Sequence, residues 1–456
     1  MTYGRKTIAL LFLGDVAAFL CSLWLTLLIR YRAIPTDTLL LAHLPSFGVL
    51  FILWTLVFYM AGLYGKRVVL FKNRLWDVIL RVQLLNIVIA ALFFFFVPGI
   101  GIAPKTNLVL YLFVSLLLIF IWRIYLFPRI TKPTTRTRAA IIGTGPELWE
   151  LVEEVNSNAR YHLEFPVVEE PEALLKDFSL FTKKLAEENV SMLVVDTTHD
   201  MLRPLLGSIY ELAYVKHAYQ FVDFYDVYEE VFDRVPLSLL EYDWFLKNVS
   251  GTGTAFYETA KRTIDIVGAL IMGLITIIAL PFVWLAMRLE GPGPLFLKQN
   301  RIGLHDSGIK TYKFRSMTYD NSSSAEWVGE EAQKNTVTNV GSFLRQTSLD
   351  EFPQFLNILR GELSLIGPRN DTMGLGERLA DAIPYYGIRY AVKPGITGWA
   401  QINQQYEQGN ISPQSIEETK TRLAYDFYYI KNRSLGLDIV IALKTVKRML
   451  FRVSSW

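Results

Sequence analysis

Two adjacent carboxylates, Asp350 and Glu351, stand just before Pro353 in the segment Ser-Leu-Asp-Glu-Phe-Pro-Gln. Proline fits the first turn of a helix, so the pair is expected at a helix N-terminus, where the positive helix end attracts phosphate. A carboxylate there can attack phosphorus to form an acyl phosphate, and its neighbour can hold Mg²⁺. The structural alternative is helix capping, by a capping box between Ser348 and Glu351 or by Asp350 as the N-cap.

Basic residues flank this acidic pair. Five of them fall within one short stretch, and they would either bind anionic lipid headgroups or line the walls of a site for a phosphorylated substrate; they are Lys298, Arg301, Lys310, Lys313 and Arg315. Arg345 precedes Asp350 by five residues, and Arg369, next to Pro368, follows it by nineteen. Arginine suits forked phosphate recognition, so these residues are candidate phosphate ligands.

The composition places the pair in a membrane protein. Hydrophobic residues make up 52% of the 456 residues, charged residues only 20%, and mean hydropathy is +0.27. A net charge of +3 gives no basic field for nucleic acid, and the single cysteine, Cys21, excludes an intramolecular disulfide and a cysteine-based metal site.

Residues 1–130 are predicted to form four transmembrane helices. Each apolar stretch has about twenty residues, enough to cross a core of ~30 Å; the stretches are Ile8–Ile29, Pro45–Tyr64, Leu84–Ala103 and Leu108–Phe127. Eleven Lys/Arg lie in the terminal segments and the middle loop, against three in the other two loops, so both ends should face the cytoplasm. Asp15, inside the first stretch, is either a functional intramembrane carboxylate or one hydrogen-bonded to a neighbouring helix.

Residues 138–248 show the alternating pattern of a small parallel α/β module. Ala139–Ile142, Val190–Asp196 and Tyr219–Asp223 are strand candidates, with a helix from Pro146 to about Ser157. Gly143-Thr144-Gly145 follows the first strand, but Leu148 stands where a dinucleotide fingerprint needs a third glycine. The loop is either a structural turn or a cofactor site, and the module is expected to be regulatory or structural, with a homodimer left open.

A fifth apolar run, 264–289, is interrupted by Pro281. The arm before the proline has sixteen residues, about 24 Å of helix, which is short of a ~30 Å core. Because basic residues flank both ends, we expect a re-entrant hairpin that enters from the cytoplasm and returns; the alternative is a fifth transmembrane helix with a proline kink. Leu435–Phe451 is either a helix on the membrane surface or one that faces a soluble core. The turn Lys393–Gln401 would either bind a nucleotide base or close a tight loop.

Residues 258–456 resemble the bacterial sugar transferases, the polyprenyl-phosphate hexose-1-phosphate transferases. The resemblance rests on several ordered blocks: Lys261–Asp265, Tyr312–Met317, Ser348–Gln354, Leu363–Arg369, Lys393–Gln401 and Asp426–Ile430. The four apolar stretches and the Rossmann-like α/β module resemble the long-form members. The fold implied is a four-helix transmembrane bundle, this module and a mainly α catalytic domain with a re-entrant hairpin.

The resemblance implies transfer of sugar-1-phosphate from a UDP-sugar to undecaprenyl phosphate in the bacterial inner membrane, with release of UMP. This step would initiate the repeat units of exopolysaccharide, capsule or O-antigen. By position, Asp350 would form a covalent phosphosugar intermediate, Glu351 would bind Mg²⁺, and Arg345 and Arg369 would hold phosphates. The sequence departs from the family pattern at Leu280-Pro281 (usually Ser-Pro), at Asn370 (usually proline) and at Asn339, where many members carry arginine.

Two other functions stay open at this point. Membrane-bound nucleotide-sugar dehydratases also combine four transmembrane helices with a Rossmann domain, but need an intact glycine fingerprint and a Tyr-x-x-x-Lys pair within it. Tyr257 and Lys261 have that spacing outside the module. The other alternative is an inactive scaffold for polysaccharide assembly, against which the Asp350-Glu351 pair argues. The sequence does not identify the sugar.

Overall fold

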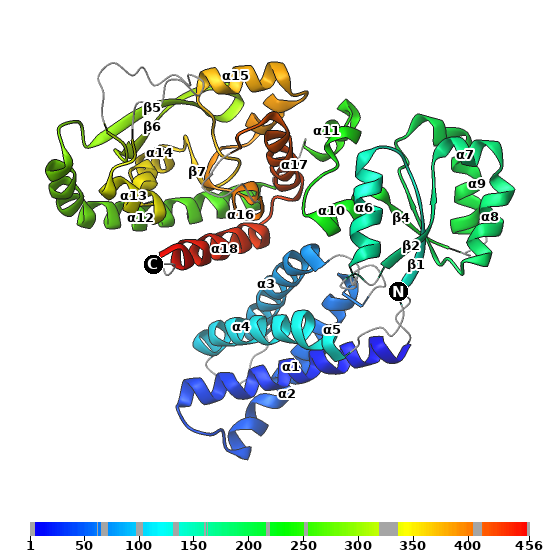
Figure 1. The fold of residues 1–456 in the computed structure, drawn as a ribbon. Helices are drawn as coiled ribbons and strands as arrows, with labels where there is room; N and C mark the ends of the chain where they lie inside the picture. Colours follow the sequence, from blue (N-terminus) through cyan, green and yellow to red (C-terminus); the bar gives the residue numbers. More distant parts are fainter. Residues whose placement is uncertain are drawn as a thin grey trace. The chain divides into compact units, whose positions relative to one another are not determined.

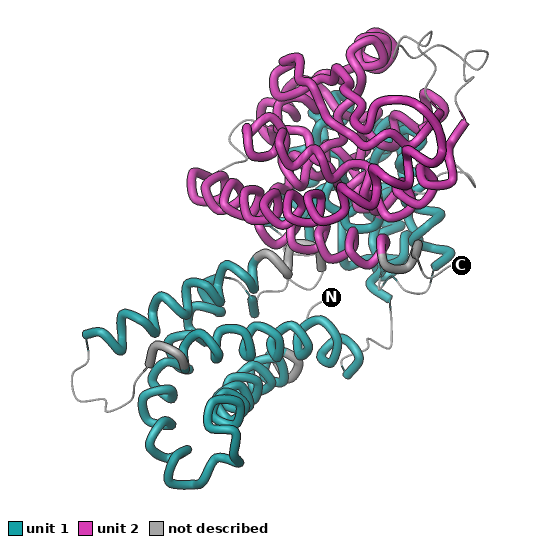
Figure 2. Tube along the Cα trace, turned by 90° about the vertical axis from the view of Figure 1, so that its left-hand side faces the viewer, with its two compact units in different colours: residues 1–231 teal, residues 232–456 magenta. Residues whose placement is uncertain are grey.

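The computed structural model describes residues 5–61, 63–64, 72–96, 104–130, 136–158, 161, 163–215, 219–249, 254–318, 336–404 and 413–453. The chain divides into two units, Met1–Val231 and Phe232–Trp456, which are coloured separately in Figure 2 and described separately below.

Long apolar helices form the first part of the first unit (Figure 1). They are α1 (Arg5–Tyr31), α2 (Asp37–Met60), α3 (Lys72–Phe96) and α4 (Pro104–Phe120), which continues as a π-helical segment, Ile121–Leu126, into α5 (Phe127–Ile130). The helix α2 starts eight residues before the predicted stretch because Thr36 caps it, accepting from Leu39 N at 3.4 Å, and Pro45 lies inside it. The predicted residues 97–103 lie outside the described part. All four are long and apolar enough to cross a membrane.

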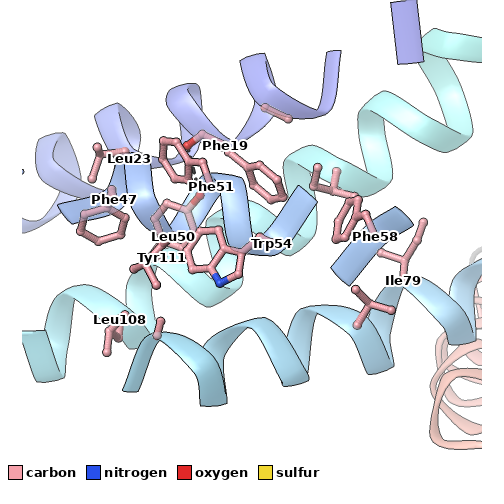
Figure 3. Packing of buried hydrophobic residues seen from close by; sticks show 14 of the residues in the cluster. Phe19, Leu23, Phe47, Leu50, Phe51, Trp54, Phe58, Ile79, Leu108 and Tyr111 are labelled. Atoms are coloured by element: carbon pink, nitrogen blue, oxygen red, sulfur yellow. Dashed lines mark hydrogen bonds between the residues drawn. The ribbon is translucent and has the colours of Figure 1, made fainter. Parts of the chain in front are cut away.

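Aromatic side chains fill the interior of these helices (Figure 3). The ring of Phe19 lies 5.7 Å from Phe51, 5.5 Å from Trp54 and 5.4 Å from Phe58. Large apolar side chains such as Leu13 and Ile52 are exposed on the outside. An apolar exterior around a packed interior is the arrangement expected of helices that face lipid.

Asp15 is held in an ion pair between the first and fourth apolar helices. Arg123, on the π-helical segment, donates from Nε to Oδ1 at 2.9 Å and from Nη2 to Oδ2 at 2.5 Å. Tyr64 donates to Oδ2 at 2.8 Å, and Arg123 Nη1 also donates to the Leu63 carbonyl at 2.9 Å. This arrangement confirms the structural interpretation of Asp15, since its charge is neutralised within the bundle.

The rest of the first unit is a parallel α/β module. Its four strands pair in the order β2-β1-β3-β4, all parallel: β1 (Thr137–Ile142), β2 (Leu163–Glu169), β3 (Met192–Val195) and β4 (Gln220–Asp223). Figure 1 shows α6 (Pro146–Ser157) on one face and α7 (Pro171–Lys176), α8 (Phe178–Glu187) and α9 (Leu206–Tyr210) on the other. The strand β2 was not predicted, because its sequence LEFPVVE has no continuous apolar run and includes Glu164 and Pro166.

The second unit begins earlier than the predicted boundary at residue 248. The chain leaves α10 (Phe224–Phe232) and packs residues of α11 (Tyr242–Asn248) on the second unit. The ring of Phe245 lies 4.8 Å from that of Tyr385 and 5.2 Å from that of Phe427. Aromatic contacts, which composition alone does not locate, therefore assign residues 232–248 to the second unit.

The second unit is mainly helical, as predicted, and it also contains two small sheets that were not predicted. Antiparallel β5 (Phe296–Ile302) and β6 (Gly308–Phe314) form one sheet, and parallel β7 (Ser364–Ile366) and β8 (Gly395–Thr397) form the other. The helices are α12 (Ala255–Glu290), α13 (Asn339–Gln346), α14 (Phe355–Arg360), α15 (Met373–Ala382), α16 (Trp399–Asn403), α17 (Ile416–Asn432) and α18 (Leu435–Val453).

The predicted hairpin segment lies within one continuous helix, α12, of 36 residues that includes Pro281. In Figure 1 the C-terminal end of α12 turns toward β5. The part before the proline packs through Ala269 on Ile358 and Leu363, and the part after it packs through Val283 on Phe314. One face of α12 thus packs on the rest of the second unit, both before and after Pro281. Apolar residues of its other face are exposed.

Candidate functional site

Asp350 and Glu351 lie on a 3-10 helix, Leu349–Gln354, that runs directly into α14. Pro353 lies within this helix, as its position predicted. Ser348 precedes it with φ of 57°, in the left-handed region, and its side chain caps no backbone group. The capping box is therefore not formed, which leaves the Glu351 carboxylate available for other partners.

Those partners are two cations from segments that are distant in the sequence. Lys313, on β6, and Arg369, just after β7, each donate to the same oxygen, Oε1 of Glu351, at 2.7 Å. Burial opposes ionisation of Glu351, but the charges of Arg369 and Lys313 outweigh it and hold the pKa of this carboxyl well below its ordinary value. Glu351 is thus ionised at neutral pH and is held between two cations.

Asp350 has the opposite environment. Burial and the neighbouring charge of Glu351 raise the pKa of Asp350 to about 6, although Lys313, Arg369 and Arg345 act in the other direction. Among the described residues, none donates a hydrogen bond to this carboxylate. Its oxygens are therefore not engaged by a protein donor, and its charge changes close to neutral pH.

The other predicted cations divide between the site and the scaffold. Arg345, on α13, is half-buried and close enough to Asp350 to influence its pKa. Arg315 instead donates to backbone carbonyls at the C-terminal end of α12, reaching Met287 O at 3.3 Å and Gly291 O at 3.2 Å. This placement gives Arg315 the role of a helix cap and differs from the substrate-binding role expected of it.

Arg301 also lies near the site. The sequence places it within the basic stretch but indicates no role of its own for it. It lies on β5 and donates to the Asn370 carbonyl at 2.8 Å and to Gln299 Oε1 at 2.9 Å. Burial, together with the charge of Arg369, lowers its pKa to about 10. Its membership of the basic stretch was the only sequence signal, because the pairing of β5 with Asn370 is not visible in the sequence.

The loop that carries Pro368 and Arg369 is fixed by close backbone contact. A Cβ on Gly367 would lie 2.4 Å from the Lys393 carbonyl oxygen, so glycine is needed there. The nearby turn holds Trp399, which is buried, stacks on Tyr428 at 5.6 Å and donates to the Asp233 carbonyl at 2.7 Å. Trp399 therefore belongs to the core, which supports the tight-loop interpretation of this turn over base binding.

Only a sparse metal site can be built from these residues. The described part of the chain has no group of three or more His, Cys, Asp or Glu side chains that could hold a metal. Mg²⁺, however, is commonly held by one or two carboxylates, with waters and substrate phosphates completing its shell. Asp350 and the second oxygen of Glu351, Oε2, which the Lys313 and Arg369 contacts leave unused, fit such a site.

Tyr257 and Lys261, which have the dehydratase spacing, serve a different purpose. Both contact Asp438 Oδ2, at 3.0 and 2.9 Å, and so fasten α12 to α18. Both are buried, and they lie outside the α/β module. The contacts with Asp438 therefore give Tyr257 and Lys261 a structural role.

Comparison with known proteins finds a family to which the second unit is similar. The model of the family described as bacterial sugar transferase matches residues 256–452. The exopolysaccharide production protein of Rhizobium leguminosarum bv. phaseoli is 36% identical over 195 residues, which are 42% of this chain and 96% of that protein.

Two further relatives are longer than the Rhizobium protein, so that the match covers less of each. The UDP-N-acetylgalactosamine-undecaprenyl-phosphate N-acetylgalactosaminephosphotransferase of Aeromonas hydrophila is 37% identical over 42% of this chain and 44% of its own length. The UDP-glucose:undecaprenyl-phosphate glucose-1-phosphate transferase of Escherichia coli K12 is 40% identical over 41% of this chain and 39% of its own length. The matched part thus spans about two fifths of these relatives, and their names differ in the sugar.

Proposed function

The chain belongs to the bacterial sugar transferase family, and on this premise we propose that it transfers a sugar-1-phosphate from a UDP-sugar to undecaprenyl phosphate, with release of UMP. The names of the relatives from Aeromonas and Escherichia carry this reaction type. The transfer would initiate a polysaccharide repeat unit in the bacterial membrane. The relatives' different sugars leave the sugar of this chain open.

The observation that carries the proposal is the pairing of an open carboxylate with an anchored one. Asp350 has no hydrogen-bond donor among the described residues, whereas Glu351 is fixed by Lys313 and Arg369 at 2.7 Å each. Lys313, Arg369 and Arg345 are all close enough to Asp350 to lower its pKa, so a diphosphate bound beside Asp350 would meet several positive charges. An ionised Asp350 carboxylate among these cations is suited to nucleophilic attack on phosphorus.

The reaction then proceeds in two displacements. An Asp350 carboxylate oxygen attacks the phosphorus that bears the sugar, and the bond from that phosphorus to the bridging oxygen breaks, so that UMP leaves with this oxygen. A phosphate oxygen of undecaprenyl phosphate next attacks the same phosphorus and releases the Asp350 carboxylate. The product is a lipid-linked sugar diphosphate. Arg345, half-buried beside Asp350, would neutralise charge on the transferred phosphoryl group.

Mg²⁺ would be held by Asp350 and Glu351 and would supply charge neutralisation at the diphosphate oxygens when bound. Lys313 and Arg369 keep Glu351 ionised, which is the form that can bind a cation.

The membrane arrangement is also part of the proposal. A straight helix of 36 residues would be about 54 Å long, well beyond a hydrocarbon core of ~30 Å. Because both parts of α12 pack on the second unit, a crossing helix would draw that unit into the bilayer. We therefore infer a re-entrant hairpin with its bend near Pro281, and a catalytic unit on the cytoplasmic side, where UDP-sugars are made.

The test uses the full chain purified in detergent or lipid particles with Mg²⁺, undecaprenyl phosphate and a panel of UDP-sugars. UMP release from one sugar, lost with EDTA and in Asp350→Asn, is the expected result and names the donor. Without the lipid, a donor labelled in the sugar-bearing phosphate should label the protein but not Asp350→Asn. UDP release would overturn the proposal, and a folded protein that releases neither nucleotide would favour a scaffold.

A further inference from the structure

A buried cluster of charge lies behind the loop that carries Arg369. Two arginines and two aspartates form it, each at most 8% exposed: Arg389, Arg422, Asp371 and Asp426. Arg389 comes from the 3-10 helix Tyr386–Ala391, and Arg422 and Asp426 come from α17. The four charges sum to zero, so the cluster is neutral although it lies in the core.

Arg389 connects this cluster to the active-site loop. Its Nη2 donates to the main-chain carbonyl of Arg369 at 2.7 Å and lies 2.8 Å from Asp426 Oδ2. Its Nη1 donates to Asp371 Oδ2, two residues after Arg369. One guanidinium thus holds the loop both by its backbone and by the Asp371 side chain.

Asp371 is itself fully engaged. Arg422 Nη2 donates to Oδ1 at 3.0 Å, and the hydroxyls of Tyr386 and Tyr390 donate to Oδ2 at 2.8 and 3.0 Å. Its main-chain carbonyl accepts from Ile302 N at 2.9 Å. The loop therefore has almost no freedom to move away from the cluster.

We propose that Arg389 is a positioning residue, which sets the backbone of Arg369 so that the Arg369 side chain reaches Glu351. Arg369 is one of only two groups that donate to Glu351 within the described part of the chain, so its place decides how that carboxylate is oriented. A buried ion cluster adds little net stability over apolar packing, and it is better explained by the geometry it imposes. A guanidinium can donate in a fork to a carboxylate and a carbonyl at once, which an ammonium cannot reproduce in the same geometry. The catalytic consequence rests on the proposed function.

The first experiment is a double-mutant cycle on kcat and KM for UMP release, with Arg389→Lys, Arg369→Ala and the double variant. Arg389→Lys should lower kcat/KM by about tenfold to a hundredfold, with melting temperature largely retained, because it keeps the charge but loses the fork. In the Arg369→Ala background the same change should cost less than about threefold. The carbonyl that Arg389 holds is still present there, but the side chain that it positions is gone. Equal losses in both backgrounds would overturn the proposal.

A control is Arg433→Lys, since Arg433 is a half-buried arginine of the same unit, outside the cluster, and pairs with Glu258 at 3.2 Å. It should leave kcat/KM within about twofold in both backgrounds. If Arg389→Lys does not fold, Tyr390→Phe removes a single donor from Asp371 and enters the same cycle.

A second measurement does not depend on the reaction. Hydrogen–deuterium exchange of a peptide over residues 364–372 should be several-fold faster in Arg389→Lys than in the parent or in Arg433→Lys, with no change over α12. Unchanged exchange there would overturn the positioning role. If the parent protein released no UMP, the proposed function would fail while this measurement still decided the role of Arg389.

Discussion

Asp350 and Glu351 are adjacent in the chain, yet their environments shift their carboxyl pKa values in opposite directions. Burial and the charge of Glu351 raise the pKa of Asp350 to about 6. The pKa of Glu351 is lowered, because Arg369 and Lys313 outweigh its burial. Two like groups with divergent pKa values commonly divide acid–base or nucleophilic roles between them. The divergence supports the proposal that Asp350 reacts while Glu351 provides a fixed charge.

The rate of UMP release should therefore fall in mild acid. A raised pKa means that Asp350 takes up a proton as the pH falls through about 6, and the protonated acid is a poor nucleophile. Below that point kcat/KM should drop by about tenfold per pH unit. The measurement is a pH profile of kcat/KM at limiting Mg²⁺, because a cation bound by Asp350 would itself lower the pKa of this carboxyl.

Glu351 should leave no inflection in this range, since its lowered pKa keeps it ionised. A profile that is flat through about pH 6, with the protein still folded, would argue against an ionised Asp350 as the attacking group.

The two carboxylates should also differ in what they contribute to stability. Glu351→Gln leaves the charges of Lys313 and Arg369 uncompensated and should lower the free energy of unfolding by about 3–5 kcal/mol. Asp350→Asn removes a carboxylate whose ionised form is disfavoured, so the melting temperature should stay the same or rise. Thermal unfolding of both variants at neutral pH makes the comparison, and a larger loss in Asp350→Asn would contradict it.

A glycine pair tests the close contact behind Arg369. Gly367→Ala would place a methyl group 2.4 Å from the Lys393 carbonyl oxygen, so the loop must shift. A displacement of this size should lower kcat/KM by about a hundredfold. Gly374→Ala is the control, because a Cβ on this glycine of α15 would meet no atom within 4 Å outside its own helix, and it should leave kcat/KM unchanged. Similar activity in the two variants would show that the loop tolerates the shift.

The sequence predicted where the acidic pair lies on its helix better than it predicted which residues contact the site. The positions of Asp350, Glu351 and Pro353 predicted a helix start, and the structure places them there. It could not show that Ser348 adopts a left-handed conformation, which removes the capping box, or that Arg315 caps α12. Those outcomes depend on contacts between segments distant in sequence, which local patterns do not encode.

The fold was predictable where hydropathy dominates. The apolar stretches gave the helices of the first unit, but their starts were missed where Thr36 caps α2 and where α3 extends into the polar segment from Lys72. The short strands β7 and β8 escaped prediction because each has three residues and is stabilised by its partner. Elements this short carry no periodicity to detect.

Whether α12 crosses the membrane can be decided by labelling its two ends. In a Cys21→Ser background, which removes the sole cysteine, Phe256→Cys and Leu289→Cys place thiols at positions 70% and 81% exposed, one near each end of α12. A re-entrant hairpin puts both thiols on the cytoplasmic side, so a membrane-impermeant maleimide should label neither in intact spheroplasts and both after permeabilisation. A helix that crosses would expose one thiol to the reagent in intact cells. The first pattern is the expected one, because both parts of α12 pack on the rest of the second unit.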